Sequence, residues 1–254
     1  MKIFRPIILS LKLFRISLHL ISGLTLTLLF VRDGIHNSNT ASRLFIWWNK
    51  RLCYIFKAKI AVHGDMNPEA TLYVMNHISW FDIPALASQQ PLHFLSKAEV
   101  KSWPLIGWFT QRAGTLFIQR GATGAAENSL NEITQCLKDG GSVVVFPEGT
   151  TTDGSNLRNF HGRLLQAAIN AQVKLQPVAL RYPYKESINP HVPYIDEMTF
   201  MDSVMGLTKS RPLKVELHFL EPIDTHLHET AVITNKQLAL QAKQAIASKL
   251  NLDR

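Results

Sequence analysis

The sequence predicts an α/β domain with a mixed, largely parallel sheet flanked by helices, preceded by an N-terminal two-helix membrane anchor. Three observations support this fold class. The chain has 254 residues, of which 46% are hydrophobic and 18% charged, and this composition suits one large folded domain with a small appendage. Residues 1–62 carry ten Lys or Arg and a single acid, whereas the remainder is nearly neutral. From Ala61 onward, short β-rich runs alternate with helical segments.

The first predicted helix lies in the basic N-terminal segment. Residues 16–31 carry no charged side chain, and as a helix they would extend about 24 Å, which is short of the roughly 30 Å hydrocarbon core of a bilayer. Extending the helix back to Ile7 gives a spanning length but includes Lys12 and Arg15. Whether residues 7–31 cross the bilayer or lie in one leaflet stays open from the sequence.

A second, amphipathic helix is predicted over Thr40–Lys59. Its apolar side chains fall on one broad stripe, and most of its Lys and Arg residues lie elsewhere. The paired Trp47 and Trp48 and a basic face are typical of the interface between lipid headgroups and acyl chains, although an ordinary core helix is the alternative. We expect residues 1–60 to form the anchor on a phospholipid surface and residues 61–254 to form the α/β domain. The interleaving of basic and apolar residues disfavours nucleic acid as a partner.

Strand and helix signals alternate through the body of the chain, which predicts a sheet covered by helices. The two cysteines are too few for a disulfide scaffold, so stability must come from packing. Strands are expected at Thr71–Met75, Leu92–Leu95, Thr115–Ile118, Ser142–Phe146, Leu175–Leu180 and Leu213–Leu220. Helices are expected at Trp80–Ala87, Ala122–Leu137, Leu157–Ala171 and Asn235–Leu250.

A candidate catalytic pair follows the first of these strands. His77 lies in a polar corner, and Asp82 lies in the first turn of the next predicted helix. A carboxylate bound to one imidazole nitrogen fixes the tautomer and leaves the other nitrogen to accept a proton. The alternative is structural, because Ser79 and Asp82 have the spacing of a capping box, in which Asp82 would serve only the helix N-terminus.

Two further strand ends carry groups suited to a polar ligand. The strand at 142–146 ends in the sequence Pro-Glu-Gly-Thr, a corner that can present the Glu148 carboxylate and backbone amides, although a simple turn fits equally well. The strand at 115–118 is followed by Arg120, whose guanidinium suits a phosphate.

Taken together and in this order, the motifs resemble those of the glycerolipid acyltransferases, whose best-known members are 1-acylglycerol-3-phosphate acyltransferases. The resemblance covers about Tyr73 to Leu180. Its four motifs correspond, in chain order, to Asn76-His77-x4-Asp82, Phe117-x-x-Arg120, Phe146-Pro147-Glu148-Gly149-Thr150 and the Pro-containing strand Val173–Val178.

The resemblance implies a membrane-associated O-acyltransferase that moves an acyl chain from acyl-CoA or acyl-ACP to the free hydroxyl of a lysolipid. By the same resemblance, His77 would be the general base and Asp82 would orient it. No cofactor beyond the acyl thioester and no metal are implied. The implied substrate-binding residues are Lys97, Arg120, Glu148, Gly149 and Thr150.

Lysophosphatidate, which would give phosphatidate, is the acceptor expected first. Family members that form phosphatidate usually place Arg or Ser directly after Phe-Pro-Glu-Gly-Thr, whereas Thr151 stands here. Relatives that act on lyso-ornithine lipid or on lysophosphatidylcholine-like acceptors look similar at this position, so another lysolipid is the alternative. Arg158 or Arg163, on the next predicted helix, would compensate for the missing Arg.

Two other function classes stay open. A lipid hydrolase would use the same His–Asp pair to activate water, and a non-catalytic protein would dock on a membrane and hold lipid in a pocket. Abundant Lys and Arg beside the anchor, and a thioester donor made inside the cell, predict an inner-membrane location with the catalytic domain facing the cytoplasm. His226 and His228 are expected to be solvated because no carboxylate or Cys cluster accompanies them.

Overall fold

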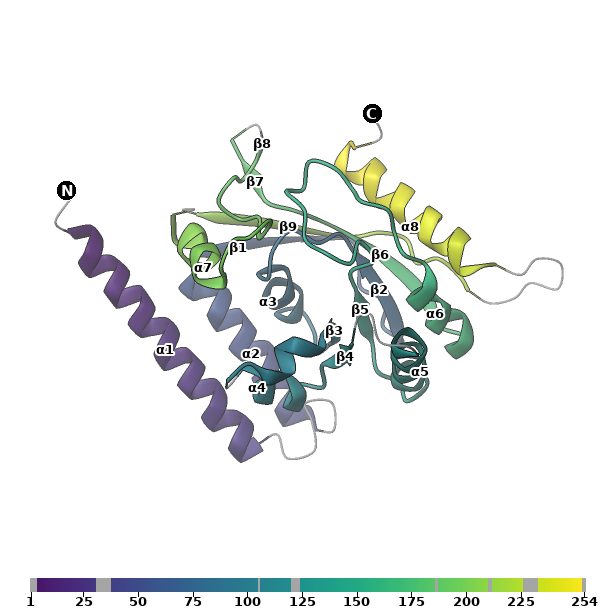
Figure 1. Ribbon diagram of the computed structural model, residues 1–254, viewed down its shortest axis with the longest axis horizontal. Coiled ribbons are helices and arrows are strands. Elements are labelled where there is room, and N and C mark those ends of the chain that lie inside the picture. The colour runs from purple at the N-terminus through teal and green to yellow at the C-terminus, as the bar shows by residue number, and fades with distance from the viewer. Residues whose placement is uncertain are drawn as a thin grey trace.

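The computed structural model describes residues 4–30, 38–104, 106–119, 124–185, 187–209, 212–225 and 233–252. Its centre is a seven-stranded sheet with the strand order β1-β9-β6-β2-β5-β3-β4 (Figure 1). These strands are β1 (Ala58–His63), β2 (Thr71–Met75), β3 (His93–Lys97), β4 (Leu116–Ile118), β5 (Val143–Val145), β6 (Lys174–Arg181) and β9 (Leu213–Phe219), and a separate hairpin joins β7 (Pro183–Tyr184) to β8 (Ser187–Ile188).

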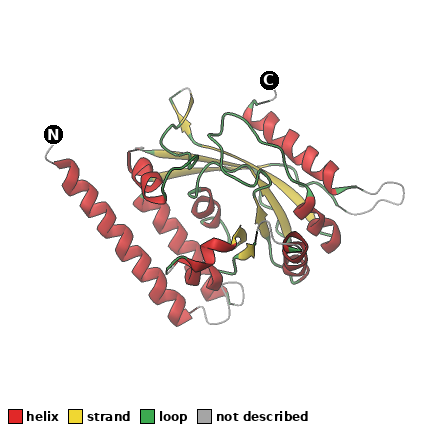
Figure 2. Cartoon of the chain, viewed as in Figure 1, coloured by secondary structure: helices red, strands yellow, loops and turns green. Residues whose placement is uncertain are grey.

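Helices cover both faces of this sheet (Figure 2). They are α1 (Phe4–Phe30), α2 (Asn39–Ile55), α3 (Asp82–Ala87), α4 (Ile106–Arg112), α5 (Ala125–Lys138), α6 (Gln166–Ala171), α7 (Phe200–Lys209) and α8 (Asn235–Leu250), with 3-10 turns at η1 (Ala98–Ser102) and η2 (Arg163–Leu165).

The sheet is mixed and mostly parallel, which confirms the α/β part of the predicted fold class. Strands β6, β2, β5, β3 and β4 all run in one direction. Strand β9 is antiparallel to β6, and β1 is parallel to β9. Parallel strands must be covered on both faces, and the five residues of β2 are accordingly all buried.

The two faces of β2 enter two separate cores, as the alternation of side chains along a strand requires. Tyr73 and Met75 pack with residues of α2 and α3, including Trp48. Leu72 and Val74 pack instead with residues of α5, α6 and α8. Helix α2 is therefore part of the main hydrophobic core and is joined to the α/β domain by packing as well as by the chain.

Several elements differ from the sequence-based expectation. The second helix ends at Ile55, because Lys57 adopts a left-handed conformation with φ of 56° and strand β1, which the sequence did not predict, begins at Ala58. The predicted boundary between residues 60 and 61 thus falls inside β1. The helix expected over 157–171 begins only with η2 and α6, since the preceding residues form a loop against the end of β5. Helix α8 has the predicted bounds.

Helices α1 and α2 pack closely around a glycine. A Cβ added at Gly23 would lie 2.5 Å from Nε1 of Trp48, so only glycine permits this approach. The Trp48 Nε1 donates to the carbonyl of His19 at 3.1 Å, and the two rings stack with centroids 4.4 Å apart. Within the described residues, we find no helix with the length and apolar character needed to traverse a bilayer.

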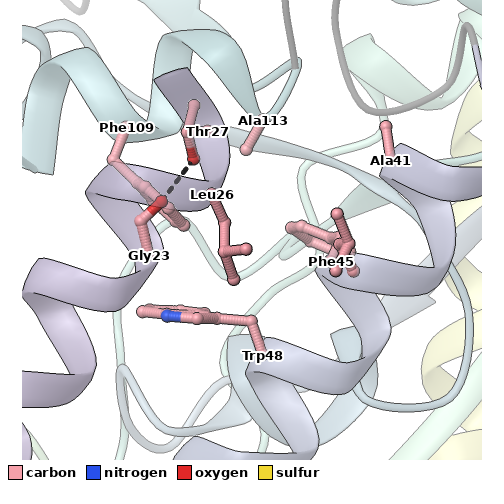
Figure 3. Close-up of a pocket in the computed structure, with 9 residues that line it drawn as sticks. Gly23, Leu26, Thr27, Ala41, Phe45, Trp48, Phe109 and Ala113 are labelled. Atoms are coloured by element: carbon pink, nitrogen blue, oxygen red, sulfur yellow. Dashed lines mark hydrogen bonds between the residues drawn. The ribbon is translucent and has the colours of Figure 1, made fainter. Parts of the chain in front are cut away.

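An apolar cleft, partly open to solvent, lies between α1, α2 and α4 (Figure 3). Beside it, α1 and α2 expose large apolar side chains to solvent. The most exposed of them are Leu11, Phe14, Leu18, Ile21, Leu28, Leu29, Phe30, Trp47 and Tyr54.

Candidate active site

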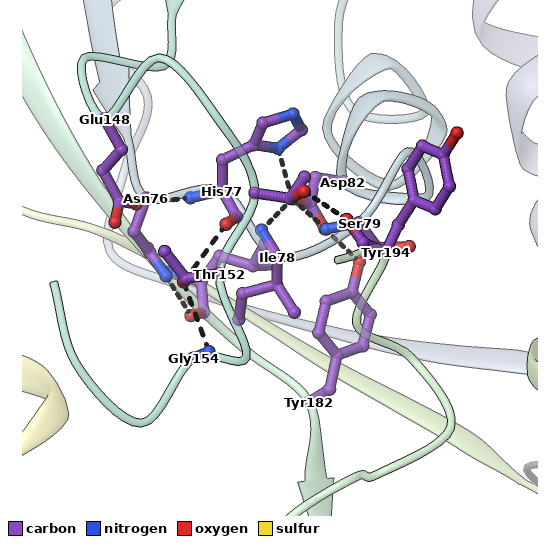
Figure 4. A network of polar contacts seen from close by, with 12 residues as sticks. Asn76, His77, Ile78, Ser79, Asp82, Glu148, Thr152, Gly154, Tyr182 and Tyr194 are labelled. Atoms are coloured by element: carbon purple, nitrogen blue, oxygen red, sulfur yellow. Dashed lines mark hydrogen bonds and ion pairs between the residues drawn. The ribbon is translucent and has the colours of Figure 1, made fainter. Parts of the chain in front are cut away.

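The predicted His77–Asp82 pair is present at the end of β2. The Nδ1 of His77 lies 2.8 Å from Oδ2 of Asp82, which is the first residue of α3 (Figure 4). The same oxygen accepts the backbone N–H groups of Ile78 at 2.7 Å and Ser79 at 2.9 Å. An oxygen that accepts two N–H groups cannot also hold a proton toward His77, so Nδ1 is the donor and Nε2 is left to accept a proton.

Asp82 thus makes the contact with His77 that the sequence predicted, and it also has a structural part in the turn before α3. Its carboxylate orders the turn before α3, but the reciprocal capping box with Ser79 does not form, and α3 has no side-chain cap at its N-terminus. Asp82 is fully buried, whereas 18% of the His77 side chain is exposed. The imidazole can thus meet a substrate while its partner stays out of water.

Leu180 at the end of β6 and Tyr182 directly after it make hydrogen bonds that support the His77–Asp82 pair. The Tyr182 hydroxyl donates to Oδ1 of Asp82 at 2.6 Å. Directly before His77, the Asn76 side-chain amide makes two hydrogen bonds with the backbone of Leu180, one to its carbonyl at 2.9 Å and one from its N–H at 2.8 Å. Sequence reasoning missed Tyr182, although its place just after a strand of the sheet was the available signal.

The Glu148 corner lies beside the pair because β5 is the parallel neighbour of β2. The Oε1 of Glu148 accepts the backbone N–H of His77 at 2.9 Å, and its Oε2 accepts that of Arg158, also at 2.9 Å. Burial raises the pKa of Glu148, and the two backbone donors partly oppose this rise. Phe146, two residues earlier, stacks on the His77 ring with centroids 3.9 Å apart.

The chain after Glu148 folds back over the catalytic pair. The backbone N–H of Thr152 donates to the carbonyl of His77 at 2.8 Å. At Gly154, with φ of +81°, a Cβ would lie 2.8 Å from Cδ1 of Ile78, so this turn requires glycine. Thr151 does not point at a ligand, because its hydroxyl donates to the carbonyl of Tyr194.

The other predicted substrate-binding residues lie after β5 and at the end of β3, apart from Arg120. Gly149 forms the turn after β5 with φ of +71°, and Thr150 is exposed next to it. Lys97 is exposed at the end of β3, the other neighbour of β5. Arg120 lies outside the described residues.

One cluster of metal-ligating side chains occurs among the described residues. His63, Glu216 and His218 place their ligand atoms within 4.8 Å of one another on β1 and β9. The Arg181 guanidinium, however, donates to Glu216 at 2.6 Å, and its positive charge opposes a divalent cation there. We therefore assign this cluster no metal. His226 and His228 lie outside the described residues.

The fold and the arrangement of the site, a histidine paired with a buried carboxylate beside a glutamate corner at the ends of parallel strands, fit the α/β acyltransferases that the motifs resemble. Comparison with known families agrees. A family model described as Acyltransferase matches residues 59–181, and the chain belongs to this family. The protein is accordingly an enzyme that transfers acyl groups, and its predicted family is confirmed.

Individual relatives narrow the comparison. The chain is 40% identical over 204 residues to the lyso-ornithine lipid O-acyltransferase of Pseudomonas aeruginosa, covering 80% of this chain and 77% of the relative. It is 40% identical over 116 residues to the 1-acyl-sn-glycerol-3-phosphate acyltransferase of Neisseria gonorrhoeae, covering 46% of each chain.

The fold is also similar to a solved structure. The crystal structure of the 1-acyl-sn-glycerophosphate (LPA) acyltransferase PlsC from Thermotoga maritima matches with a TM-score of 0.70 and 21% identity, covering 99% of this chain and 97% of that one. At this level of identity the match supports the architecture of the sheet and its helices, and the activity rests on the family and the closer relatives.

Proposed function

We propose that the protein transfers an acyl chain from acyl-CoA or acyl-ACP to the free hydroxyl of a lysolipid. The observation that carries the mechanism is the Nδ1–Oδ2 bond of 2.8 Å between His77 and Asp82. It holds the imidazole with Nε2 available as the general base, which supports a direct transfer without an acyl-enzyme.

In the proposed reaction, Nε2 of His77 takes the proton of the acceptor hydroxyl as its oxygen attacks the thioester carbonyl. The tetrahedral intermediate then expels the thiolate, which receives the proton from His77, so an ester and a free thiol leave and the base is restored. The positive charge on the imidazole between these steps is stabilised by the buried Asp82 carboxylate.

For the acceptor, we infer lyso-ornithine lipid, which reverses the order expected from the sequence. The relative with that name matches four fifths of this chain, whereas the lysophosphatidate enzyme matches less than half. The loop after Glu148 carries charges of both signs: Asp153 follows Thr152, which bonds to His77, and the backbone of Arg158 bonds to Glu148. Both side chains are exposed, and hydrogen bonds from Ser155 lower the pKa of Asp153 and keep it anionic.

This pair of charges suits an amino-acid headgroup. An N-acylated ornithine keeps a carboxylate and a side-chain ammonium, which complement Arg158 and Asp153 respectively. A phosphate monoester would meet the same Arg but be repelled by Asp153. Lysophosphatidate remains the second candidate, favoured by the exposed Lys97 at the end of the neighbouring strand β3.

We also propose that α1 and α2 hold the enzyme on an anionic phospholipid surface, with the active site on the cytoplasmic side of the inner membrane. Their exposed apolar side chains and the basic residues of α2 support this arrangement. Acceptor and product are both lipids, so a catalytic domain kept at the membrane would exchange them without crossing water.

The chemistry is tested by acyl transfer from labelled acyl-CoA and acyl-ACP to a panel of lyso-ornithine lipid, lysophosphatidate and lysophosphatidylcholine. We expect diacyl product from one acceptor, and a loss of roughly 10²–10⁴-fold in His77→Ala, since positioned proton transfer contributes about that much. His191→Ala, at an exposed histidine, serves as the control. Thioester hydrolysis without acceptor would instead indicate a hydrolase, and bound lipid without turnover a lipid-binding protein.

The acceptor is tested by charge changes on the loop. Asp153→Asn should lower kcat/KM for lyso-ornithine lipid by about tenfold and raise it for lysophosphatidate, which is roughly the effect of one charge-assisted contact. Arg158→Gln should weaken both acceptors. Arg163→Gln is the matched control, because that guanidinium pairs with Glu127 at 3.5 Å on the exposed surface. Equal effects of Asp153→Asn on both acceptors would reject the ornithine assignment.

A further inference from the structure

We propose that Tyr182 is a positioning residue of the active site, whose hydroxyl fixes the Asp82 carboxylate in the orientation that holds His77. The inference rests on the proposed function only in that His77 is taken as the base. It concerns a residue more than a hundred positions along the chain from the His77 motif, in a segment that follows β6.

The two oxygens of Asp82 are held in different ways. Oδ2 accepts three groups from its own loop, namely the His77 ring and the N–H groups of Ile78 and Ser79. Oδ1 accepts the Tyr182 hydroxyl at 2.6 Å, its one hydrogen bond among the described residues. Both Asp82 and Tyr182 are completely buried, so water cannot replace this bond. Rotation of the carboxylate would break it, and the phenol therefore sets the angle at which Oδ2 faces His77.

The segment that carries Tyr182 is itself tied to the other side of His77. Leu180, two residues earlier, exchanges two hydrogen bonds with the side chain of Asn76. Strands β6 and β2 are parallel neighbours in the sheet. The chain at the end of β6 thus fixes two residues close to His77. Asn76 is hydrogen-bonded to the backbone of Leu180, and Asp82 accepts the hydroxyl of Tyr182 (Figure 4).

The phenol is a permanent donor in this position. Burial, and next the charge of Asp82, raise the pKa of Tyr182 well above its ordinary value, so the hydroxyl keeps its proton at every pH at which the enzyme works. The other titratable groups near the pair are Glu148, which accepts the N–H of His77, and Cys53 on α2, whose burial raises its pKa to about 12. At neutral pH, both Cys53 and Tyr182 therefore stay protonated and uncharged.

Removal of the hydroxyl should change His77 in two measurable ways. The carboxylate loses its one donor at Oδ1, so its hydrogen bond with the Nδ1–H of His77 changes in length and angle, and the Nδ1–H proton resonance of the imidazole shifts. The carboxylate is also free to turn, so the imidazole is misaligned more often and kcat falls. Binding of either substrate involves neither group, so KM should stay nearly constant.

The test is Tyr182→Phe, compared with Tyr73→Phe as the matched control. Tyr73 is also fully buried, and its hydroxyl donates to the carbonyl of Asn67 at 3.2 Å, away from Asp82. We expect Tyr182→Phe to lower kcat by about 10- to 100-fold with each KM within about twofold, and to shift the Nδ1–H proton resonance of His77 in NMR spectra of the labelled ring. Tyr73→Phe should leave this resonance unchanged.

The same Nδ1–H resonance of His77 in the wild type, Tyr182→Phe and Tyr73→Phe would overturn the inference and leave Tyr182 a packing residue. The NMR measurement needs no substrate, so it decides this question even if the wild type transfers no acyl group to any lysolipid, the result that would reject the proposed function. Should Tyr182→Phe not fold, 3-fluorotyrosine placed at position 182 keeps the bond with a stronger donor. It should shift the Nδ1–H resonance of His77, and an unchanged resonance would equally overturn the inference.

Discussion

At the scale of single residues, the Glu148 carboxylate connects two loops through hydrogen bonds. Each of its oxygens accepts one backbone N–H, from His77 on one side and Arg158 on the other, and only 4% of the residue is exposed. A group used in this way has little capacity left for a ligand. We interpret Glu148 as holding the acceptor-binding corner in shape, with contact to substrate left to the loop that it anchors.

Glu148→Gln should therefore be damaging although it is nearly isosteric. A glutamine amide offers one acceptor oxygen and one NH₂ donor, so one of the two backbone N–H groups would face a donor. We expect the free energy of unfolding to fall by about 1–3 kcal/mol and kcat to fall about tenfold. Denaturant unfolding and steady-state kinetics measure the two effects. Glu127→Gln, at an exposed glutamate of α5, is the control. Unchanged stability with a raised KM would show instead that Glu148 binds substrate.

The same carboxyl group predicts a pH dependence. Burial raises the Glu148 pKa above the ordinary 4.5, so the native state binds this proton more tightly than the unfolded chain does. Stability should therefore fall as the pH rises from 4.5 through the native pKa, and then level off. This component should be missing from the unfolding free energy of Glu148→Gln measured over the same pH range.

Whether a contact between two site residues could be predicted from the sequence depended on how far apart the two residues lie along the chain. His77 and Asp82 are five residues apart, so their spacing at the end of a strand was enough to predict the contact. Tyr182 contacts Asp82 across a hundred residues, and its role depends on which strands are neighbours, which no local pattern reveals. The backbone contact of Arg158 with Glu148 was missed for a related reason: its segment was predicted as helix, and only the loop brings its backbone to Glu148.

At the scale of elements, the contact between α1 and α2 contains a buried titratable group. The His19 ring lies against Trp48, is 4% exposed, and has no hydrogen-bond partner for either nitrogen in the described part of the chain. Burial, and next the charge of Arg51, lower its pKa from 6.5 to about 4. The packed helices therefore hold His19 in its neutral form.

The lowered pKa of His19 predicts that low pH reduces the stability of the packed helices α1 and α2. The unfolded chain binds the His19 proton more tightly than the native state, so stability is lost as the pH falls from about 6.5 toward about 4. Between pH 7.5 and pH 5 we expect a cost of about 1–2 kcal/mol, or a few degrees in Tm. His19→Phe keeps a ring against Trp48 and should show a smaller acid-induced drop in Tm, while His191→Phe should behave as the wild type. Identical pH profiles of His19→Phe and the wild type would contradict the prediction.

Strands were easier to predict than the helices around them. The long apolar runs of the central strands stand out because both faces are buried, as in β2 and β6. Strand β1 has mostly exposed side chains and joins the sheet only by pairing with β9, so its short sequence gave no comparable signal. The direction of β9, antiparallel to β6, likewise depends on the path of the whole chain.

At the scale of the whole molecule, apolar exposure and basic charge coincide on one side. Helices α1 and α2, which carry the exposed apolar residues, lie on the side of the sheet away from α8 (Figure 1). The same helix pair exposes Arg43, Lys50 and Arg51. A lipid surface with anionic headgroups complements both features, since the apolar side chains enter the acyl boundary and the charges stay at the headgroups.

Vesicle flotation measures separately how much the apolar side chains and the basic charges contribute to membrane binding. Replacing Arg43, Lys50 and Arg51 by Gln should weaken binding to anionic vesicles by about fivefold per charge, because each charge near such a surface contributes about 1 kcal/mol. The same replacement should remove most of the salt dependence and leave binding to zwitterionic vesicles unchanged. Replacing Leu18, Ile21 and Leu28 by Gln should weaken binding to both kinds of vesicle. Leu240→Gln provides the matched control, since that leucine is 56% exposed on α8, beyond the opposite face of the sheet. If Leu240→Gln weakens binding as much as the changes on α1 do, the membrane does not meet the molecule at the helix pair, and acceptor lipid must reach His77 by another side.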